Sequence, residues 1–175
     1  MVKLLSRDAS HKSDVGGVQL NIKNHKELAL TISGMKKAFQ EISPQPAIDG
    51  FLVQKMAEEG VECFVGGRQD PVFGPIVIAG LGGVFLEIFK DTAIRLAPIT
   101  KNEAMDMLKN LKTYPVLQGA RGKIKADIDA LADVICKVSN LLAKVPDIAE
   151  IDLNPVIVHE TGKGVSIVDS RVFFK

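Results

Sequence analysis

The feature that most constrains the fold is a polar β-hairpin near the end of the chain. Two apolar, β-branched runs, Val156–Val158 and Val165–Val168, flank the segment 160–164, which reads Glu-Thr-Gly-Lys-Gly. Turn residues between two such runs predict a hairpin. Because side chains alternate between the two faces of a strand, Asp152 and Asn154 are expected to share one face.

This hairpin face is unusually rich in oxygen donors. Folding the chain about Thr161-Gly162 places Asp169 nearly opposite Asn154, while Glu150 and Asp152 stand on the same face as Asn154. Such a face is costly to build unless a cation or polar ligand occupies it. Carboxylate and amide oxygens suit magnesium, which completes its shell with water and phosphate. The sequence therefore predicts a cation site here, and a solvated hairpin edge is the alternative.

Composition excludes some functions. The 175 residues are 46% hydrophobic and 25% charged, enough for one domain or two small lobes. The net charge is +1, with 22 basic and 21 acidic residues interspersed, which argues against nucleic acid as a partner. The absence of Trp and the single Tyr argue against a base-stacking platform.

The location is expected to be cytoplasmic, with no membrane association. Cys63 and Cys136 lie in apolar runs without metal-binding spacing, which favours buried, reduced thiols. The first eight residues meet charge at once and do not form a signal peptide. The longest apolar run, Pro75 to Leu86, is too short and too rich in glycine to span a membrane.

Helices and strands are expected to alternate along the chain. Asn24, Thr100 and Asp127 are predicted to begin helices, because apolar residues follow each of them at helical spacing. Short apolar runs predict strands at Val2–Leu5, Val18–Ile22, Phe51–Gln54, Glu62–Val65, Ile76–Ala79, Val84–Phe89 and Ala93–Ala97. The five runs from residue 51 onward are expected to form one antiparallel sheet. The predicted class is α+β (or α/β), with helices covering a mostly antiparallel sheet.

The segment from His11 to Val18 reads His-Lys-Ser-Asp-Val-Gly-Gly-Val and is expected to be a loop between two strands. Its glycine pair lets backbone amides approach an anion. An imidazole beside a lysine and an aspartate could accept or pass on a phosphoryl group, because histidine can act as a nucleophile. The alternative is a solvated loop with a glycine turn.

Three further stretches carry weaker signals. The segment 80–87 is rich in glycine, but it matches neither the dinucleotide-binding fingerprint nor a P-loop. The segment 51–62 could offer backbone groups to a purine and Glu62 to a ribose; an ordinary hairpin with Met56 in the core is the alternative. Arg121 lies between glycines and could clamp a phosphate, although isolated arginines are usually surface charges.

Six motifs occur in order and together resemble one family. They are His11-Lys-Ser-Asp-Val-Gly-Gly-Val, Val53-Gln-Lys-Met, Gly60-Val-Glu-Cys-Phe-Val-Gly, Asp70-Pro-Val-Phe-Gly-Pro, Gly80-Leu-Gly-Gly-Val-Phe-Leu-Glu and Glu150-Ile-Asp-Leu-Asn-Pro. From Lys3 to Phe173 the chain resembles the ATP-grasp β subunit or domain of ADP-forming acyl-CoA synthetases, the acetate–CoA ligase group related to succinyl-CoA synthetase. The joint occurrence of the motifs makes the resemblance specific.

The resemblance implies an enzyme component that binds Mg²⁺ and ATP or ADP. Such enzymes interconvert acyl-CoA, ADP and phosphate with the free acid, CoA and ATP. A phosphohistidine carries the phosphoryl group between an acyl-phosphate site on a CoA-binding α subunit and the nucleotide. The expected partner is that α subunit, in a hetero-oligomer. The alternative is a non-catalytic assembly or regulatory module with the same fold.

The resemblance also assigns roles residue by residue. His11 matches the phosphoryl-carrying histidine, Asp152 matches the carboxylate that addresses a phosphorylated histidine, and Asn154 and Asp169 match the magnesium ligands. The residues expected at the nucleotide are Lys3, Gln54, Met56, Glu62, Gly82, Gly83 and Arg121.

The resemblance further predicts two lobes. Residues 1–48 are expected to be the remnant of a first ATP-grasp lobe, and residues 49–175 a second lobe with the nucleotide and magnesium site. ATP-grasp domains of this family begin with a further helix–strand unit ahead of the strand that carries Lys3. The first lobe is therefore expected to be truncated at its N-terminal side.

Overall fold

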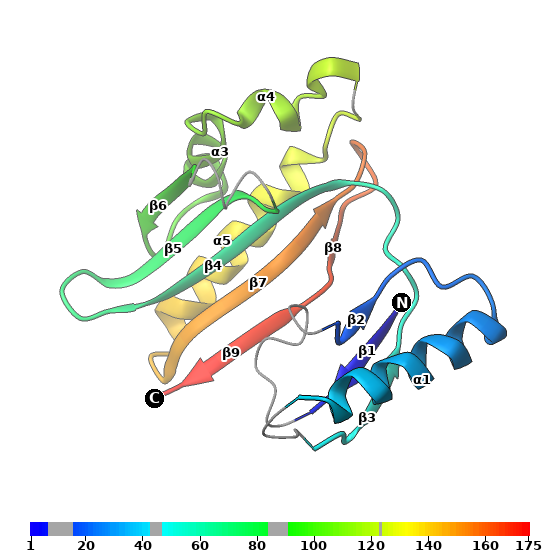
Figure 1. Ribbon diagram of the computed structural model, residues 1–175. Coiled ribbons are helices and arrows are strands. Elements are labelled where there is room, and N and C mark those ends of the chain that lie inside the picture. Colours follow the sequence, from blue (N-terminus) through cyan, green and yellow to red (C-terminus); the bar gives the residue numbers. More distant parts are fainter. Residues whose placement is uncertain (7–15, 43–46, 84–90, 123) are drawn as a thin grey trace. The chain divides into compact units, whose positions relative to one another are not determined.

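The chain folds into two compact units, Met1–Met56 and Ala57–Lys175. The computed structural model describes residues 1–6, 16–42, 47–83, 91–122 and 124–175, and for Arg121 it describes the backbone alone (Figure 1). Both units combine helices with antiparallel strands, as the sequence predicts. Each unit is described by itself below.

The first unit is a small sheet with one helix. Its elements in chain order are β1 (Val2–Leu5), β2 (Val18–Gln19), α1 (His25–Gln40) and β3 (Gly50–Val53). The strand order is β2-β1-β3, and both pairings are antiparallel. In this register Lys3 lies between Val18 and Leu52.

The core of the first unit forms between this sheet and α1. The apolar residues that follow Asn24 at helical spacing pack in this core, and they are Leu28, Ile32, Met35, Phe39 and Ile42. Val2 and Leu4 of β1 are fully buried against them. The predicted cap is also present, because the Asn24 side chain accepts a hydrogen bond of 3.0 Å from the backbone N–H of Glu27.

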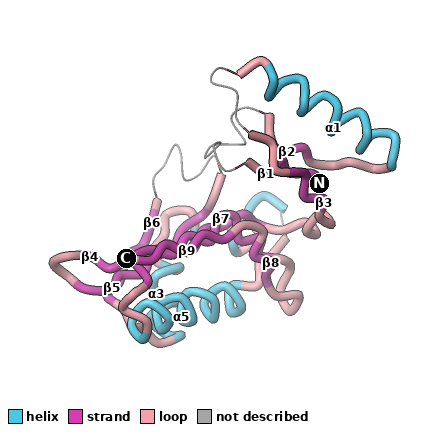
Figure 2. The backbone as a smooth tube through the Cα atoms, turned by 90° about the horizontal axis from the view of Figure 1, so that it is seen from below, coloured by secondary structure: helices cyan, strands magenta, loops and turns pink. Residues whose placement is uncertain are grey.

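The second unit is built on a longer antiparallel sheet. Its elements are β4 (Val61–Asp70), β5 (Gly74–Leu81), β6 (Thr92–Leu96), α3 (Lys101–Lys109), α4 (Tyr114–Leu117), a 3₁₀ helix (Ala120–Gly122), α5 (Ile128–Lys144), β7 (Ile148–Val158), β8 (Val165–Ile167) and β9 (Ser170–Phe174). The strand order is β6-β5-β4-β7-β8. β9 also pairs with β7, along residues 148–153, whereas β8 pairs with residues 156–158. Figure 2 shows α3 and α5 together on one side of these strands.

One face of this sheet packs against the helices and forms the core. We call the opposite face the open face. On β4, Val61, Cys63 and Val65 belong to the core packed on the helices, so Glu62 and Phe64 point to the opposite face. On β7, Ile151 and Leu153 are buried in the same core. Asp152 and Asn154 consequently lie on the open face, as the alternation in the sequence predicts.

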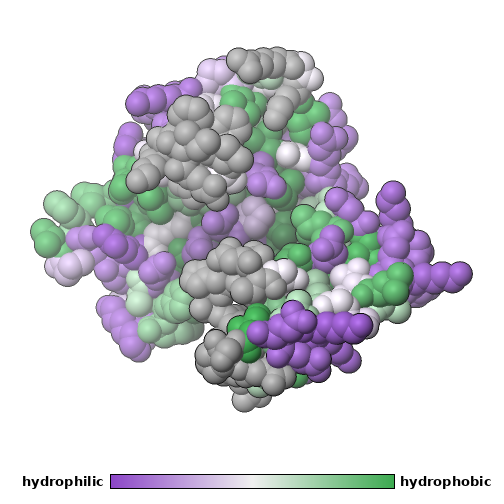
Figure 3. Space-filling model, in the orientation of Figure 1, coloured by the Kyte–Doolittle hydropathy of each residue, from purple (hydrophilic) through white to green (hydrophobic). Residues whose placement is uncertain are grey.

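The β4–β5 hairpin ends in a firmly held turn. The Asp70 carboxylate accepts hydrogen bonds from the backbone N–H groups of Val72 (3.0 Å) and Phe73 (3.1 Å). Val72 and Phe73 remain 79% and 69% exposed. Figure 3 shows apolar atoms at this end of the hairpin.

Two predictions about the sheets need correction. Phe51–Gln54 was expected to join the sheet of the later strands, but β3 pairs with β1 in the first unit. The division of the chain accordingly falls after Met56, whereas the sequence placed it after residue 48. The cause is physical: an isolated apolar strand carries no information in its own residues about which edge it will pair with.

Other predictions concern helices, cysteines and membranes. The apolar residues that follow Thr100 and Asp127 at helical spacing pack in the core, while α4 and the 3₁₀ helix were not anticipated. Cys63 is buried and Cys136 is partly buried, and both are free thiols. The predicted strand Val84–Phe89 lies outside the described residues. None of the described helices combines the length and apolar content needed to cross a bilayer.

Asp127 ties the start of α5 to the turn of the closing hairpin. One carboxylate oxygen accepts from the N–H of Ala130 (3.2 Å), which caps the helix. The other accepts from the N–H groups of Gly162 and Gly164, each at 2.9 Å. The bond from Gly164 is the first of the causes that hold the pKa of the Asp127 carboxyl below its ordinary value of 3.8.

We predict that Asp127→Asn destabilises the chain by about 1–3 kcal/mol, because the amide has one acceptor oxygen and cannot accept from Ala130 as well as from the two glycine N–H groups. Since the folded-state pKa is lowered, the contribution of Asp127 is present above pH 3.8 and is lost as pH falls through the folded value. Urea unfolding at several pH values measures this. Asp147→Asn is the control, because the Asp147 side chain is exposed and makes no hydrogen bond with the described residues. An equal loss of unfolding free energy in both variants would contradict the prediction.

Candidate functional site

The closing hairpin brings Asn154 and Asp169 together. The N–H of Asn154 donates a hydrogen bond of 3.2 Å to the backbone carbonyl of Asp169. The register is continuous on both sides of this pair, since Val156 lies opposite Ile167 and Leu153 opposite Ser170. The Asp169 carboxylate accepts from the N–H of Ser170 at 3.1 Å, which orients it at the start of β9. The predicted pairing of Asn154 with Asp169 is confirmed.

Asp152 occupies the next position along the same face. It lies between Gly66 of β4 and Arg171 of β9 in the sheet register. Burial is the main cause that raises the pKa of the Asp152 carboxyl above its ordinary value. The carboxylates of Glu150 and Asp169 raise it further, and Arg171 opposes them. The face is thus strongly acidic, with one guanidinium beside its most buried carboxylate.

Glu62 meets the glycine-rich segment at another part of this face. The N–H of Gly82 donates to the backbone carbonyl of Glu62 at 2.8 Å. A Cβ placed on Gly83 would stand 3.1 Å from a carboxylate oxygen of Glu62. Gly83 has a φ of +58°, in the left-handed region that favours glycine. The structure therefore brings Glu62, Gly82 and Gly83 together, and their assignment to the nucleotide stays a prediction from the resemblance.

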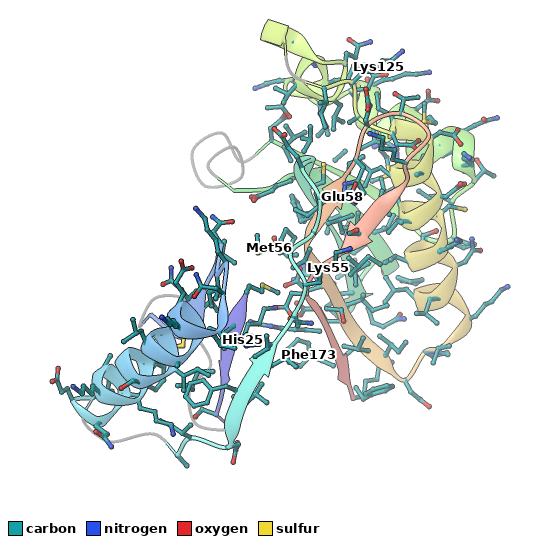
Figure 4. All side chains as sticks on the ribbon, turned by 90° about the vertical axis from the view of Figure 1, so that its right-hand side faces the viewer. His25, Lys55, Met56, Glu58, Lys125 and Phe173 are labelled. Carbon is teal, nitrogen blue, oxygen red and sulfur yellow. The ribbon has the colours of Figure 1, made fainter. Side chains whose placement is uncertain are left out.

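The remaining nucleotide candidates belong to the first unit. The N–H of Gln54 donates to the carbonyl of Met1 at 3.0 Å, so the pairing of β3 with β1 continues one residue beyond β3. Lys3 and Gln54 therefore share the face of the small sheet that points away from α1. Figure 4 shows Met56 on the extended segment after β3, where it is 37% exposed. Met56 is therefore not a core residue of a hairpin.

Gln54 shows a property typical of a binding site. Its side-chain carbonyl oxygen is buried and has no hydrogen-bond partner. It is the one such side-chain atom among the described residues, and leaving it unpaired costs about 1–3 kcal/mol. A ligand that donates a hydrogen bond, such as the exocyclic amine of a purine, would satisfy it.

The structure does not describe the side chains of two candidate site residues. His11 falls in the segment 7–15, outside the described residues. Arg121 is in the 3₁₀ helix Ala120–Gly122, but its side chain is not described. Their assigned roles remain predictions from the sequence.

The donor chemistry at Asn154 and Asp169 fits magnesium. One amide oxygen and one carboxylate stand on adjoining backbone segments, and both are hard oxygen donors. Among the described residues no group of three or more His, Cys, Asp or Glu side chains could hold a metal ion by itself. A metal bound here would complete its shell with water and phosphate oxygens, which is how Mg²⁺ usually binds.

The fold and this site define the class of protein. A family model described as an ATP-grasp domain matches residues 1–174. The chain belongs to this family, and the predicted ATP-grasp fold is confirmed.

Curated relatives indicate which kind of ATP-grasp protein the chain is similar to. The β subunit of acetate–CoA ligase [ADP-forming] I from Pyrococcus furiosus is 43% identical over 172 residues, covering 98% of this chain and 73% of that protein. Acetate–CoA ligase [ADP-forming] I from Archaeoglobus fulgidus is 44% identical over 179 residues, covering 98% of this chain but 25% of that protein. The chain thus spans a quarter of the Archaeoglobus relative.

Solved structures agree with this placement. Acetyl-coenzyme A synthetase 1 of Candidatus Korarchaeum cryptofilum, in complex with coenzyme A, Ca-AMPCP and HgCl⁺, gives a TM-score of 0.91 at 39% identity, covering 99% of this chain and 75% of that one. The same enzyme with coenzyme A and Mg-AMPPCP, its phosphohistidine segment pointing towards the nucleotide binding site, gives 0.83 at 36% identity. That match covers 100% of this chain and 76% of the other.

Sequence reasoning overlooked Arg171. The signal was present, because the same fold about Thr161-Gly162 that pairs Asn154 with Asp169 also pairs Asp152 with Arg171. Arg171 is thus a cation at a position that the hairpin register alone could have identified.

We predict that Gly83→Ala destabilises the second unit by about 1–2 kcal/mol, because a Cβ is strained at a left-handed φ. Gly82→Ala is the matched control: its added Cβ would meet Cys63 and Glu62 backbone atoms at an ordinary 3.5 Å, so its effect stays within about 0.5 kcal/mol. Chemical denaturation measures both. Equal destabilisation would show that the loop does not hold Gly83 as described.

Proposed function

We propose that this chain is the nucleotide-binding ATP-grasp part of an ADP-forming acyl-CoA synthetase. The whole reaction converts acyl-CoA, ADP and phosphate to the free acid, CoA and ATP. The observation that carries the proposal is the acidic hairpin face of Asp152, Asn154 and Asp169 in a chain similar over nearly its full length to acetate–CoA ligase β subunits.

Each unit carries residues that the resemblance assigns to the nucleotide. In the first unit, Lys3 offers a cation to phosphate, and the unpaired oxygen of Gln54 offers an acceptor to the base. In the second unit, Glu62 accepts from the ribose, and the backbone of Gly82 and Gly83 lets a ligand approach closely. Met56 and Arg121 are assigned to the same nucleotide by resemblance.

Asn154 and Asp169 would hold Mg²⁺ beside the phosphates. When bound, the ion neutralises charge on the phosphate oxygens during transfer. The protein's own contribution is to hold an amide and a carboxylate at a fixed separation on two paired backbone segments. Asp152 would face the incoming phosphohistidine.

His11 would carry the phosphoryl group. In the direction of ATP formation, a terminal phosphate oxygen of ADP attacks phosphorus. The new P–O bond forms while the P–N bond to the imidazole breaks, and the leaving nitrogen takes up a proton. Positioning and charge neutralisation supply most of the catalysis in such a step.

The acyl and CoA sites are proposed to lie on a CoA-binding α subunit or domain. The relatives named as β subunits support a partner of this kind, and we propose a hetero-oligomer. The free thiols of Cys63 and Cys136 favour a cytoplasmic location.

We predict that Asn154→Ala and Asp169→Ala weaken Mg²⁺-dependent ADP binding about 10-fold or more, because each removes a metal ligand. Isothermal titration of the full chain with ADP, with and without Mg²⁺, measures this. Melting temperatures should change little, because Asn154 is exposed and Asp169 only partly buried.

Asp147→Asn is the control for this experiment, since the residue is exposed on the turn before β7. The proposal fails if the unaltered chain binds no Mg²⁺-ADP even with its CoA-binding partner present. If the melting temperature falls strongly in both alanine variants, the hairpin face has a structural role and does not serve to bind the metal.

We predict that His11→Ala abolishes phosphoryl transfer to ADP while ADP affinity stays within about 3-fold, because the imidazole bonds to phosphorus and not to the nucleotide. Acid-labile label on the protein after incubation with γ-labelled Mg²⁺-ATP reports the transfer. Equal loss of label and of affinity would assign His11 a structural role.

A further inference from the structure

We propose that the free edge of β9 pairs with β9 of a second copy of this chain. The two strands would run antiparallel about a two-fold axis at Val172 and join the sheets of two second units into one continuous sheet. All the residues involved lie in the second unit, and the pairing needs neither nucleotide nor metal.

β9 is an edge strand with unpaired backbone groups (Figure 1). Among the described strands it pairs only with β7, and all of its residues are exposed. The carbonyl of Asp169 accepts from β7, and the N–H of Lys175 donates to the residue just before β7. Because these directions alternate along a strand, the backbone groups of Ser170, Val172 and Phe174 point to the free edge.

β9 also exposes apolar side chains on both faces of the sheet. Val172 lies opposite the core residue Ile151. Phe174 lies opposite the core residue Ile148. Both side chains therefore stand on the core face, but they remain 45% and 66% exposed, because α5 packs mainly on β4, β5 and β7. Phe173 on the open face is 51% exposed. An exposed apolar edge of this kind is a template for pairing with another strand.

The opposite edge of the sheet is protected, and β9 is not. The N–H of Ala97 donates to β5, so by alternation the backbone groups of Ile94 point outward from β6. There the Arg95 side chain donates a hydrogen bond of 2.9 Å to the Ile94 carbonyl. In the described part of the chain, no side chain makes such a bond to the backbone of Val172 or Phe174.

The charges along β9 favour one register of self-pairing. With the axis at Val172, Arg171 lies opposite Phe173 of the second copy, which allows a cation–π contact. Asp169 then lies opposite Lys175 of the second copy, an ion pair. An axis at residue 171 would oppose the two copies of Arg171, and an axis at residue 173 would oppose Arg171 to Lys175. Like charges directly opposite one another destabilise a strand pair.

This register also uses the free backbone groups. Val172 exchanges both of its backbone hydrogen bonds with Val172 of the second copy, and the N–H of Phe174 donates to the carbonyl of Ser170 of that copy. The N–H of Ser170 keeps its bond of 3.1 Å to the Asp169 carboxylate. A carboxylate has two oxygens, so its ion pair with Lys175 does not exclude the metal contact proposed for Asp169.

The test measures the mass of the full chain by sedimentation velocity, at concentrations from about 1 to 100 µM. The unaltered chain should form a dimer that dissociates on dilution. Val172→Pro removes the outward N–H but leaves the pairing with β7 intact, and should raise the dimer dissociation constant about 10-fold or more. Ile94→Pro is the matched control, since it removes an outward N–H from the protected edge, and should leave the dissociation constant unchanged.

A charge exchange tests the position of the axis. Val172→Glu and Val172→Lys should each be monomeric, because two like charges would meet at the axis. Mixing the two variants in equal amounts should restore a dimer. Circular dichroism shows whether each variant is folded, and the exchange decides the outcome if Val172→Pro does not fold.

The proposal is overturned if the unaltered chain stays monomeric over the whole concentration range. It is overturned equally if the two proline variants weaken the dimer to the same extent, or if the mixed charge variants do not associate. Each of these outcomes leaves the proposed function in place.

Discussion

The pairing of β7 is the constraint on which the second unit depends. β4 lies along one edge of β7, and β8 followed by β9 lies along the other. Its side chains alternate between the helical core, through Ile151 and Leu153, and the open face, through Asp152 and Asn154. A slip of one residue would move carboxylates into the core and apolar groups into solvent. Burial therefore fixes the register, and the register fixes the site.

The arrangement of this hairpin could be predicted because its determinants are local. The turn at Thr161-Gly162, the β-branched runs and the alternation all lie within about thirty residues and agree with one another. The helices were predictable for the same reason, since Asn24, Thr100 and Asp127 accept hydrogen bonds from the first-turn N–H groups of their own helices. Residues near in sequence were enough to specify these contacts.

What the sequence could not supply were choices between distant partners. Phe51 belongs to a strand with an ordinary apolar pattern, and its pairing with Leu4 of β1 spans 47 positions of sequence. The hydrogen bond from Gly82 to the carbonyl of Glu62 likewise depends on the pairing of β4 with β5. Roles at the nucleotide were assigned by resemblance to a family, and the unpaired oxygen of Gln54 became visible only with coordinates.

The division of labour between the two sheet faces explains how the site can be so acidic without unfolding the chain. Apolar burial on the helical side stabilises the sheet, because the side chains of Val65, Ile151 and Leu153 pack there. The open face contributes little to that core, so it can carry Asp152 with a pKa raised by burial and by neighbouring carboxylates. The cost of crowding these charges is reduced when cations arrive, and the face already holds one in Arg171. A bound metal and an arginine would thus both reduce the repulsion among the carboxylates of this face. The register that positions these groups is maintained by the opposite side of the sheet.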